Sequence, residues 1–448
     1  MVRRGRPARP VVDRASPADR AFLAMNTAEV PVQFGVLLLL GPAPGLDLAR
    51  VRQRIAERIP AVPRLRRRLV RAPLGGGGPI WADDACFDVR RHVRAAVCAP
   101  PGDRQAVLDT ALSLVSTPLP RNAPLWSATF VTGLAGHEAA LVVVFDHVLA
   151  DGVGGLAVLA RLVDGTAEPD VPPFPVPRPG AGTLRRDALA GRLRAVRRIG
   201  PALRALRRAT AAGGGLHPAR ATPCSLVGPT GPGRKLAVVR TDLSALGAAA
   251  HRYGASVNDA VLVVVAGALR RLAAARGEDV DAFVITVPVS GRTAGDGAAL
   301  GNAVSPMLVT VPATGSVRAR LGRVTSQVRS AKAAASGPPP IAVLGAAFRA
   351  AAALGGYRWY MNHQRRMHTL VSHVRGPAEP VGFGGAPVLA AIPLSVGESG
   401  NLAVVFEALS YAGTLTISVL AAADRCPDLD VLVDGLAAEL AVVRGESG

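Results

Sequence analysis

The stretch Val142-Val-Val-Phe-Asp-His147-Val-Leu-Ala-Asp151-Gly-Val-Gly-Gly155 is the most informative part of this sequence. Its β-branched and aromatic residues predict a buried central strand over residues 137–145. The glycines predict a turn over residues 146–155, and a helix begins at Leu156. Such a strand-turn-helix unit places the side chains of the turn at a sheet edge, a usual location for chemistry.

His147 follows the strand and stands among glycines that let a ligand approach closely. An imidazole has an ordinary pKa near about 6.5, so it is the natural proton acceptor at neutral pH. A histidine after a strand can also be structural. The glycines and Asp151, four residues later, favour a general base, but the residues alone leave both interpretations open.

The length of 448 residues exceeds one ordinary core, and strands alternate with covering helices on both sides of a Pro- and Gly-rich region. The pattern predicts α/β architecture, twice. The expected parts are a disordered basic arm over 1–15, an N-terminal subdomain over 16–165, a linker with a basic helix over 166–234, and a C-terminal subdomain over 235–448.

Periodicity and capping residues place the other elements. Helices are expected after Ser16, over 48–59, 103–116 and 184–208, from Ser256 to Arg276, and over 317–332, 341–361 and 429–443. Strands are expected over 32–40, 236–239, 283–289, 304–311, 369–374, 388–393, 402–409 and 415–420.

The formal net charge is +20, and Lys235 and Lys332 are the only lysines among the basic residues. A G+C-rich coding sequence is one explanation for so much arginine. Another is attraction of anionic lipid or of a phosphate-bearing substrate. Nucleic acid is disfavoured because aromatic residues make up only 4% of the chain. The basic helix over 184–208 suits a membrane surface, although packing on the domain is the favoured interpretation.

Several classes are excluded by simple patterns. The four cysteines are far apart in the sequence, so neither a metal site nor a disulfide framework is expected, and a reducing cytoplasm fits. The basic N-terminus is followed by no apolar stretch, so no signal peptide is expected. The apolar runs are also much shorter than the roughly 20 residues of a membrane span. We expect a cytoplasmic protein, soluble or associated with a membrane surface.

Asp146-His147-Val-Leu-Ala-Asp151-Gly152 resembles the His-His-x-x-x-Asp-Gly signature of coenzyme A-dependent acyltransferases and of peptide-synthetase condensation domains. Further segments, in the same order along the chain, resemble the wax ester synthase/diacylglycerol acyltransferase family. They are Ser16-Pro-Ala-Asp19, Pro124-Leu125-Trp126 preceded by Ala123, Ser256-Val-Asn258-Asp259, Leu300-Gly-Asn302 and Leu409-Ser-Tyr-Ala-Gly413. The similarity covers residues from about 15 to 443.

The resemblance implies two subdomains like chloramphenicol acetyltransferase, with a substrate tunnel between them. It implies an enzyme of lipid metabolism that forms an ester from a fatty acyl-CoA and a long-chain alcohol or diacylglycerol, as in triacylglycerol biosynthesis. His147 would be the general base. Acyl-CoA would be a co-substrate, and no bound cofactor or metal is implied.

The resemblance also implies roles for other residues. Asp151 would form a structural ion pair with Arg292 rather than take part in the chemistry. Asn258 would donate a hydrogen bond to the acyl carbonyl or oxyanion, or else be an ordinary residue of a first helical turn. Gly152 and Asp259 would support the site. The substrate tunnel would be lined by residues Pro124, Leu125, Trp126 and Asp146, although for Leu125 and Trp126 ordinary core packing is the favoured interpretation.

Asp146 is a departure, because the family signature has its first histidine at this position. In a continuing strand Asp146 and His147 face opposite ways, so the catalytic position is retained. The departure keeps two alternatives open. One is an acyltransferase for a specialised metabolite or with a carrier-protein donor. The other is a non-catalytic lipid- or membrane-binding relative.

Overall fold

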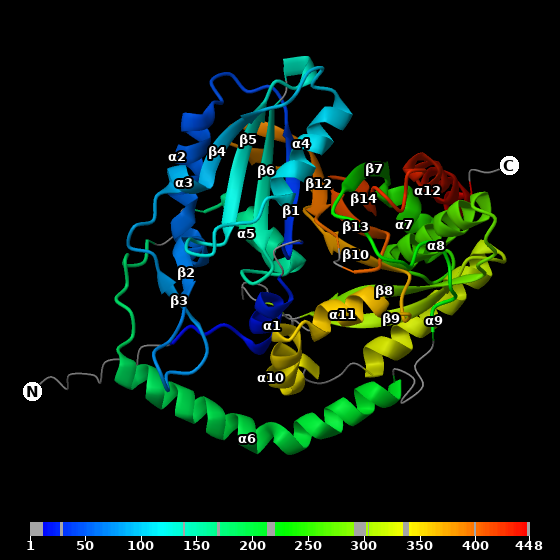
Figure 1. Cartoon of the computed structure of the whole chain (residues 1–448). Helices are drawn as coiled ribbons and strands as arrows, with labels where there is room; N and C mark the ends of the chain where they lie inside the picture. The colour runs from blue at the N-terminus through cyan, green and yellow to red at the C-terminus, as the bar shows by residue number, and fades with distance from the viewer. Residues whose placement is uncertain are drawn as a thin grey trace, which may run out of the picture.

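The computed structural model describes residues 12–26, 30–137, 139–167, 171–212, 220–290, 302, 304–334, 340–397 and 400–445. These residues form two six-stranded sheets that lie beside one another, plus a small two-stranded hairpin. Figure 1 shows helices on the outer face of each sheet and the long helix α6 (Ala181–Ala212) running along one side of the molecule. The expected α/β fold with two similar halves is confirmed.

The N-terminal sheet has the strand order β11-β12-β1-β6-β5-β4. The strands are β1 (Gln33–Leu40), β4 (Val93–Val97), β5 (Trp126–Thr132), β6 (Ala139–Asp146), β11 (Gly382–Phe383) and β12 (Ala386–Ser395). The helices of this half are α1 (Pro17–Met25), α2 (Leu48–Arg58), α3 (Val89–His92), α4 (Arg104–Ser116) and α5 (Gly152–Leu162). The hairpin is β2 (Arg67–Val70) with β3 (Ile80–Asp83), and short 3-10 turns cover Ile59–Ala61, Pro63–Arg66 and Ala135–His137.

β1 and β6 lie at the centre of the N-terminal sheet because both are apolar along nearly their whole length. They pair antiparallel, with Gln33 opposite Asp146, so the end of β6 lies beside the start of β1. Gly35 makes this close pairing possible, since a Cβ there would lie 2.5 Å from the Val143 carbonyl oxygen. The register fixes where the chain leaves β6 and enters the glycine-rich turn.

β12 corrects the expected subdomain boundary. The sequence pattern assigned residues 235–448 to the C-terminal half, but β12 pairs antiparallel with β1 in the N-terminal sheet. β11 extends the same sheet beyond β12. Neighbouring segments predict strands, but the partner of a strand more than 340 residues away depends on the tertiary fold. The C-terminal part of the chain therefore supplies two strands, β11 and β12, to the N-terminal sheet.

The C-terminal sheet has the strand order β7-β14-β13-β10-β8-β9. Its strands are β7 (Arg234–Asp242), β8 (Ala282–Ser290), β9 (Val304–Pro312), β10 (Thr369–Arg375), β13 (Val404–Tyr411) and β14 (Thr414–Ala422). The helices of this half are α7 (Leu243–His251), α8 (Val257–Ala275), α9 (Val317–Ala334), α10 (Pro340–Ala353), α11 (Gly356–His363) and α12 (Leu429–Arg444). α8 is the central helix, with a continuous buried segment over 259–269.

Most expected elements are present, and the capping predictions hold. Ser16 and Ser256 each form a capping box with the aspartate three residues later. The helix expected over 341–361 is wrong in one respect, because it is divided into α10 and α11 at Gly355, which has a positive φ of 80°. The hairpin β2–β3, the strands β4 and β5 and helix α7 were not predicted.

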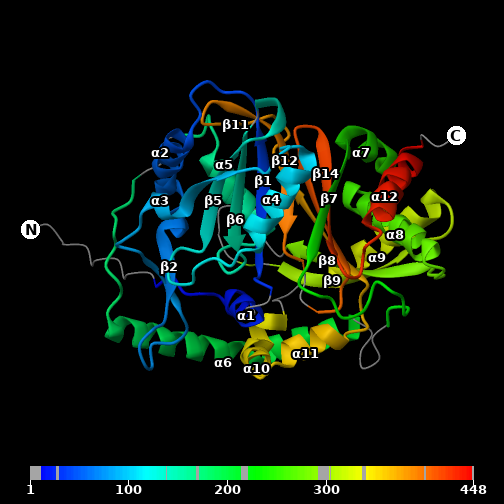
Figure 2. The ribbon, with the colours of Figure 1, turned by 45° about the horizontal axis from the view of Figure 1, so that its top comes forward.

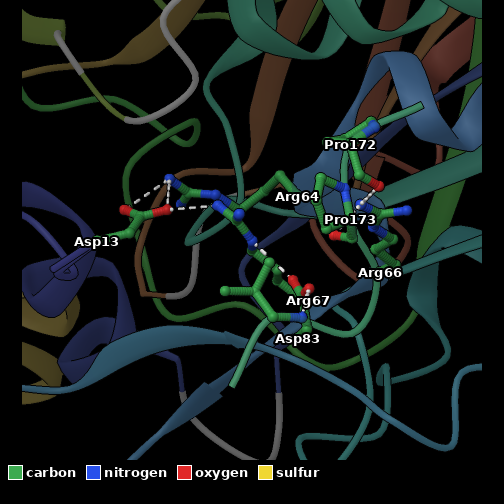
Figure 3. Close-up of polar contacts among 8 residues, drawn as sticks. Asp13, Arg64, Arg66, Arg67, Asp83, Pro172 and Pro173 are labelled. Atoms are coloured by element: carbon green, nitrogen blue, oxygen red, sulfur yellow. Dashed lines mark hydrogen bonds and ion pairs between the residues drawn. The ribbon is translucent and has the colours of Figure 1, made fainter. Parts of the chain in front are cut away.

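Residues 13 to 15 differ from the expected mobile arm. The Asp13 carboxylate accepts hydrogen bonds from Arg64 and Arg67 at 3.1 Å, and Ala15 is buried (Figure 3). A nearby arginine, Arg66, contacts the carbonyl oxygens of Pro172 and Pro173 in the linker. Ion pairing between an arginine-rich hairpin and an acidic N-terminal residue thus holds the start of the described chain on the domain.

Candidate active site

A cavity of about 590 Å³ lies between the two halves. Its walls come from both sheets, from the turn after β6, and from α1, α5, α10 and α11. Most of the lining side chains are apolar. His147, Asp151 and Gly152 are among the lining residues, so the glycine-rich turn after β6 opens onto this cavity.

The His147 imidazole is held between two phenyl rings. Phe22 of α1 stacks on it with ring centroids 5.1 Å apart and an interplanar angle of 12°. Phe34 of β1 lies on it at 4.6 Å with an angle of 41°. The His147 backbone N–H donates to the Val32 carbonyl oxygen at 3.0 Å. Ring contacts and a backbone hydrogen bond thus fix the orientation of the side chain.

The His147 ring is not stabilised in its charged form. Nδ1 is buried and has no hydrogen-bond partner among the described residues. Burial lowers the pKa of His147 to about 4, and the negative charge of Asp151 only partly opposes this effect. The imidazole is therefore neutral at physiological pH and can accept a proton. Because Nδ1 is buried, Nε2 is the ring nitrogen available to a molecule in the cavity.

Asp151 has a structural task in the turn. It is the N-cap of α5, and its carboxylate accepts a hydrogen bond from the Gly154 backbone N–H at 2.8 Å. The side chain is buried and lies at the cavity wall. Its expected partner, Arg292, lies outside the described residues. The capping bond fixes the start of α5 directly after the turn that carries His147.

Gly155 of α5 determines how close the helix comes to Phe34. A Cβ at Gly155 would lie 2.6 Å from Phe34 Cε2, which is shorter than any ordinary contact. The absent side chain lets Phe34 approach α5 on one side and His147 on the other. This glycine, quoted above only as a turn residue, therefore helps to set the position of the catalytic candidate.

Asn302 connects three segments of the predicted motifs. Its side-chain Nδ2 donates to the His147 carbonyl oxygen and to Asp19 Oδ1, the latter at 3.0 Å. Asp19 is also the capping-box aspartate of α1, the helix that supplies Phe22. Segments near residues 16–19, 147–152 and 302 are thus joined by hydrogen bonds at the site.

Asp146, expected at the substrate tunnel, is not among the residues that line this cavity. The carboxylate is 3% exposed and points away from His147 along the alternating strand. Its two oxygens accept hydrogen bonds from the Val148 backbone N–H at 2.8 Å and from Asn26 Nδ2 at 3.2 Å. Burial raises the pKa of Asp146 to about 6. Asp146 therefore stabilises the turn through its hydrogen bond with the Val148 backbone N–H.

Pro124, Leu125 and Trp126 are also not among the residues that line this cavity. Leu125 and Trp126 pack in the core of the N-terminal half. The Trp126 indole N–H donates to the Leu65 carbonyl oxygen at 2.6 Å, and its ring stacks on His92. Core packing, the alternative considered for Leu125 and Trp126, is what the structure shows.

Asn258 and Asp259 lie in the first turn of α8. Asp259 is buried and accepts hydrogen bonds from the Ser256 backbone N–H at 2.9 Å and from Thr325 Oγ1 at 3.3 Å. It stabilises the start of the helix and is not a cavity residue. Asn258 is partly exposed and is not among the residues that line the cavity with His147.

Several cavity residues were missed by sequence reasoning. Phe22 and Phe34 give no signal of their own, because an apolar residue in a helix or strand predicts burial but not its neighbour. The C-terminal half adds polar side chains from β8, β10 and β13, namely Thr286, Ser372 and Glu407. Among the described residues, no group of three histidine, cysteine or acidic side chains is arranged to hold a metal ion.

Two α/β halves with a histidine turn at their shared cavity define an acyltransferase of the two-subdomain type. The family model described as "Wax ester synthase/diacylglycerol acyltransferase catalytic domain" matches residues 15–261, and the "WS/DGAT C-terminal domain" matches residues 300–444. The chain therefore belongs to the wax ester synthase/diacylglycerol acyltransferase family, and it is an acyltransferase.

Relatives and solved structures agree with this assignment. One putative diacylglycerol O-acyltransferase of Mycobacterium tuberculosis is 28% identical over 95% of this chain and 88% of its own length. A second is 31% identical over 89% and 88%. The wax ester synthase/diacylglycerol acyltransferase of Marinobacter aquaeolei has the same fold, with a TM-score of 0.68, 20% identity and coverage of 97% and 99%. A condensation domain of the CDA synthetase shares the fold at a TM-score of 0.64, with 19% identity and 98% of each chain covered.

No helix within the described ranges combines the length and apolar character needed to cross a membrane.

Proposed function

We propose that this protein transfers a fatty acyl group from coenzyme A to the hydroxyl of a long-chain alcohol or diacylglycerol, with His147 as the general base. The observation that carries the proposal is a neutral, oriented imidazole at the wall of an apolar cavity between the two halves. A general base must be unprotonated and within reach of its substrate, and His147 meets the first condition at neutral pH.

In the proposed reaction, His147 Nε2 accepts the proton of the acceptor hydroxyl while that oxygen attacks the thioester carbonyl carbon. The C–S bond then breaks, and the imidazolium returns the proton to the departing thiolate. The products are an ester and free coenzyme A, so the proton and the acyl group are both accounted for. A positioned base of this kind contributes about 10²–10⁴ in rate.

The cavity lining supports apolar substrates. The walls around His147 include Phe22, Phe34 and Leu159 from the N-terminal half and Leu370 from the C-terminal half. Such walls favour a hydrocarbon chain and exclude water, which would otherwise hydrolyse the thioester. Both reactants held in one cavity also gain the advantage of proximity.

A direct experiment follows ester formation from palmitoyl-CoA with hexadecanol or dioleoylglycerol, using mass spectrometry for the ester and a thiol reagent for free coenzyme A. We expect the two products in equal amounts, and loss of both in His147→Ala. A matched control is His363→Ala, which removes an exposed imidazole of α11. Full ester formation by His147→Ala would overturn the mechanism. Ester formation only from an acyl carrier protein would overturn the donor.

Two further site roles are part of the proposal. Asp151 would pair with Arg292, as the family resemblance implies, and its position as a buried carboxylate at the cavity wall is compatible with such a pair. Asn258 would stabilise the oxyanion. If it does, Asn258→Ala lowers kcat by about 10²–10³ with KM nearly unchanged. A kcat within twofold of the parent enzyme would leave Asn258 as an ordinary residue of the first turn of α8.

A further inference from the structure

Helix α6 contacts the rest of the protein through one side near its start. Leu184 and Ala188 are buried there, 3% and 8% exposed. Asp187, the only acidic residue of α6, pairs with Arg14. The helix also packs against α10. Figures 1 and 2 both show α6 lying across the same side of the molecule as α10 and α11.

The opposite side of α6 carries an apolar stripe. Leu189, Leu193 and Val196 are 57%, 57% and 64% exposed. At roughly 100° per residue, they lie about 140°, 180° and 120° around the helix from Leu184. The stripe therefore faces away from the protein. This differs from the favoured expectation of a helix that packs its apolar residues on the domain.

Arginines flank this stripe on both sides. Arg192 lies about 80° around the helix from Leu184, and Arg186 and Arg197 lie at about 200° and 220°. All three side chains are exposed. α6 contains nine arginines against one acidic residue. An apolar stripe bordered by arginines is the pattern of a helix that lies in the interface of an anionic lipid layer.

α10 and α11 extend the same side with more exposed apolar groups. Leu354, in the turn between the two helices, is 89% exposed, and Trp359 of α11 is 65% exposed. Tryptophan favours the boundary between headgroups and acyl chains. Two other residues of these helices, Phe348 and Tyr357, line the cavity that contains His147.

We propose that Leu189, Leu193, Val196, Leu354 and Trp359, with Arg186, Arg192 and Arg197, form a docking surface for an anionic phospholipid bilayer. Below, this set of residues is called the α6–α11 surface. Its apolar groups enter the acyl boundary while the guanidinium groups contact phosphates. Docking does not depend on acyl transfer. One consequence rests on the proposed function: helices that line the cavity would touch the layer in which an apolar acceptor is dissolved.

The chain has three tryptophans, and Trp359 is the natural reporter because Trp81 and Trp126 are only 4% and 1% exposed. The test mixes the full-length protein with vesicles of phosphatidylcholine plus phosphatidylglycerol, or of phosphatidylcholine alone. We expect co-sedimentation with the anionic vesicles only, and a blue shift of Trp359 emission that is absent in Trp359→Phe. Binding without any change in Trp359 emission would overturn the proposed surface.

The double variant Leu189→Glu/Leu193→Glu should weaken partition onto anionic vesicles by about tenfold or more, since two charges enter the apolar stripe. The control is Val97→Glu, which places one such carboxylate at a 76% exposed valine on β4, remote from α6 in Figure 1. Equal loss in both variants, or equal binding of the double variant, would overturn the proposal. The proposal would also be overturned if the parent protein bound duplex DNA and the double variant lost this binding to the same degree as its vesicle binding.

Turnover of a short-chain acyl-CoA and a water-soluble alcohol separates docking from catalysis. We expect the double variant to retain parental turnover with these dissolved substrates, because its residues are outside the cavity. Weak vesicle binding with normal turnover supports the α6–α11 surface. Normal vesicle binding by a protein without any turnover would contradict only the proposed function. Loss of dissolved-substrate turnover in the double variant would contradict a surface role.

Discussion

His147 and His368 are both imidazoles removed from bulk solvent, one in each half, yet their surroundings differ. His368, directly before β10, accepts a hydrogen bond from the Val284 backbone N–H at Nδ1, at 2.9 Å. Its Nε2 donates to the Thr222 carbonyl oxygen at 2.8 Å. His147 Nδ1 has no hydrogen-bond partner among the described residues, and the residue lies at a cavity wall.

Burial lowers the pKa of both rings, so a lowered pKa does not distinguish them. The two rings differ in whether their nitrogens form hydrogen bonds with the protein. Both ring nitrogens of His368 form hydrogen bonds with backbone groups and connect the linker to β8, which is a structural role. His147 is held by aromatic contacts and its own backbone, which leaves Nε2 for a ligand. An oriented but unsatisfied imidazole is what marks a candidate base.

The largest expected effects come from replacing each histidine, because one variant should lose activity and the other should lose stability. His147→Ala should lower kcat by about 10²–10⁴ while the thermal midpoint changes little, because no hydrogen bond of the ring is lost. His368→Ala should lower the free energy of unfolding by about 2–4 kcal/mol, since two buried backbone groups lose their partners. Turnover per folded molecule should stay near parental. Both kcat and the free energy of unfolding should be measured on both variants. If the two variants lose the same one of these properties, the distinction between the histidines is contradicted.

A smaller loss is expected from Gly155→Val, which leaves His147 intact but pushes Phe34. The Cβ would lie 2.6 Å from the Phe34 ring, so the ring and the imidazole on it must shift. We expect kcat to fall by up to about 100-fold. The control is Gly191→Ala in α6, where a Cβ meets nothing within 4 Å and activity should be unchanged. A fully active Gly155→Val enzyme would show that Phe34 does not position the base.

Asn302→Ala should have a milder effect, of roughly tenfold on kcat, with KM nearly unchanged. It removes the hydrogen bonds to the His147 carbonyl and Asp19 but leaves both phenyl rings in place. Gln327→Ala is a matched amide control, because Gln327 binds the backbone of Thr310 at an exposed site on β9. An equal effect of both substitutions would mean that Asn302 does not act through the turn.

The pH profile is the smallest and most specific comparison. Because the folded pKa of His147 is about 4, protonation of this ring should lower kcat/KM only near pH 4 and produce no loss near pH 6.5. Asp146, with a pKa of about 6, gives at most a few-fold step near that pH. Asp146→Asn should remove this step and leave the lower limb. A single acid limb at pH 6.5 would contradict the neutral, buried imidazole.

Local patterns were enough for much of the fold. The apolar runs gave β1 and β6, and the serine caps gave the starts of α1 and α8. The turn after β6 was also found, because glycines and a histidine after a buried strand are unusual together. These features are determined by residues close to one another in the sequence, so they can be predicted from local patterns.

Features that depend on distant contacts were not predicted. The sequence left Trp126 between the tunnel and the core, with the core favoured, because which side of β5 faces the cavity depends on how the two sheets pack. Phe22 and Asn302 reach His147 only because α1 and the segment before β9 meet at the same place. The exposed stripe on α6 was likewise unexpected, because an apolar stripe usually packs inward.

The late position of β12 in the sequence has a consequence for how the protein is made. β1 is synthesised within the first 40 residues, but its neighbour spans Ala386–Ser395 and leaves the ribosome only when most of the chain has been translated. The sheet that carries His147 therefore stays incomplete through most of elongation, with one edge of β1 unpaired. Separately expressed halves should not yield an independent catalytic module, so domain-splitting or gene-fusion work on this enzyme has to keep both ends of the chain together.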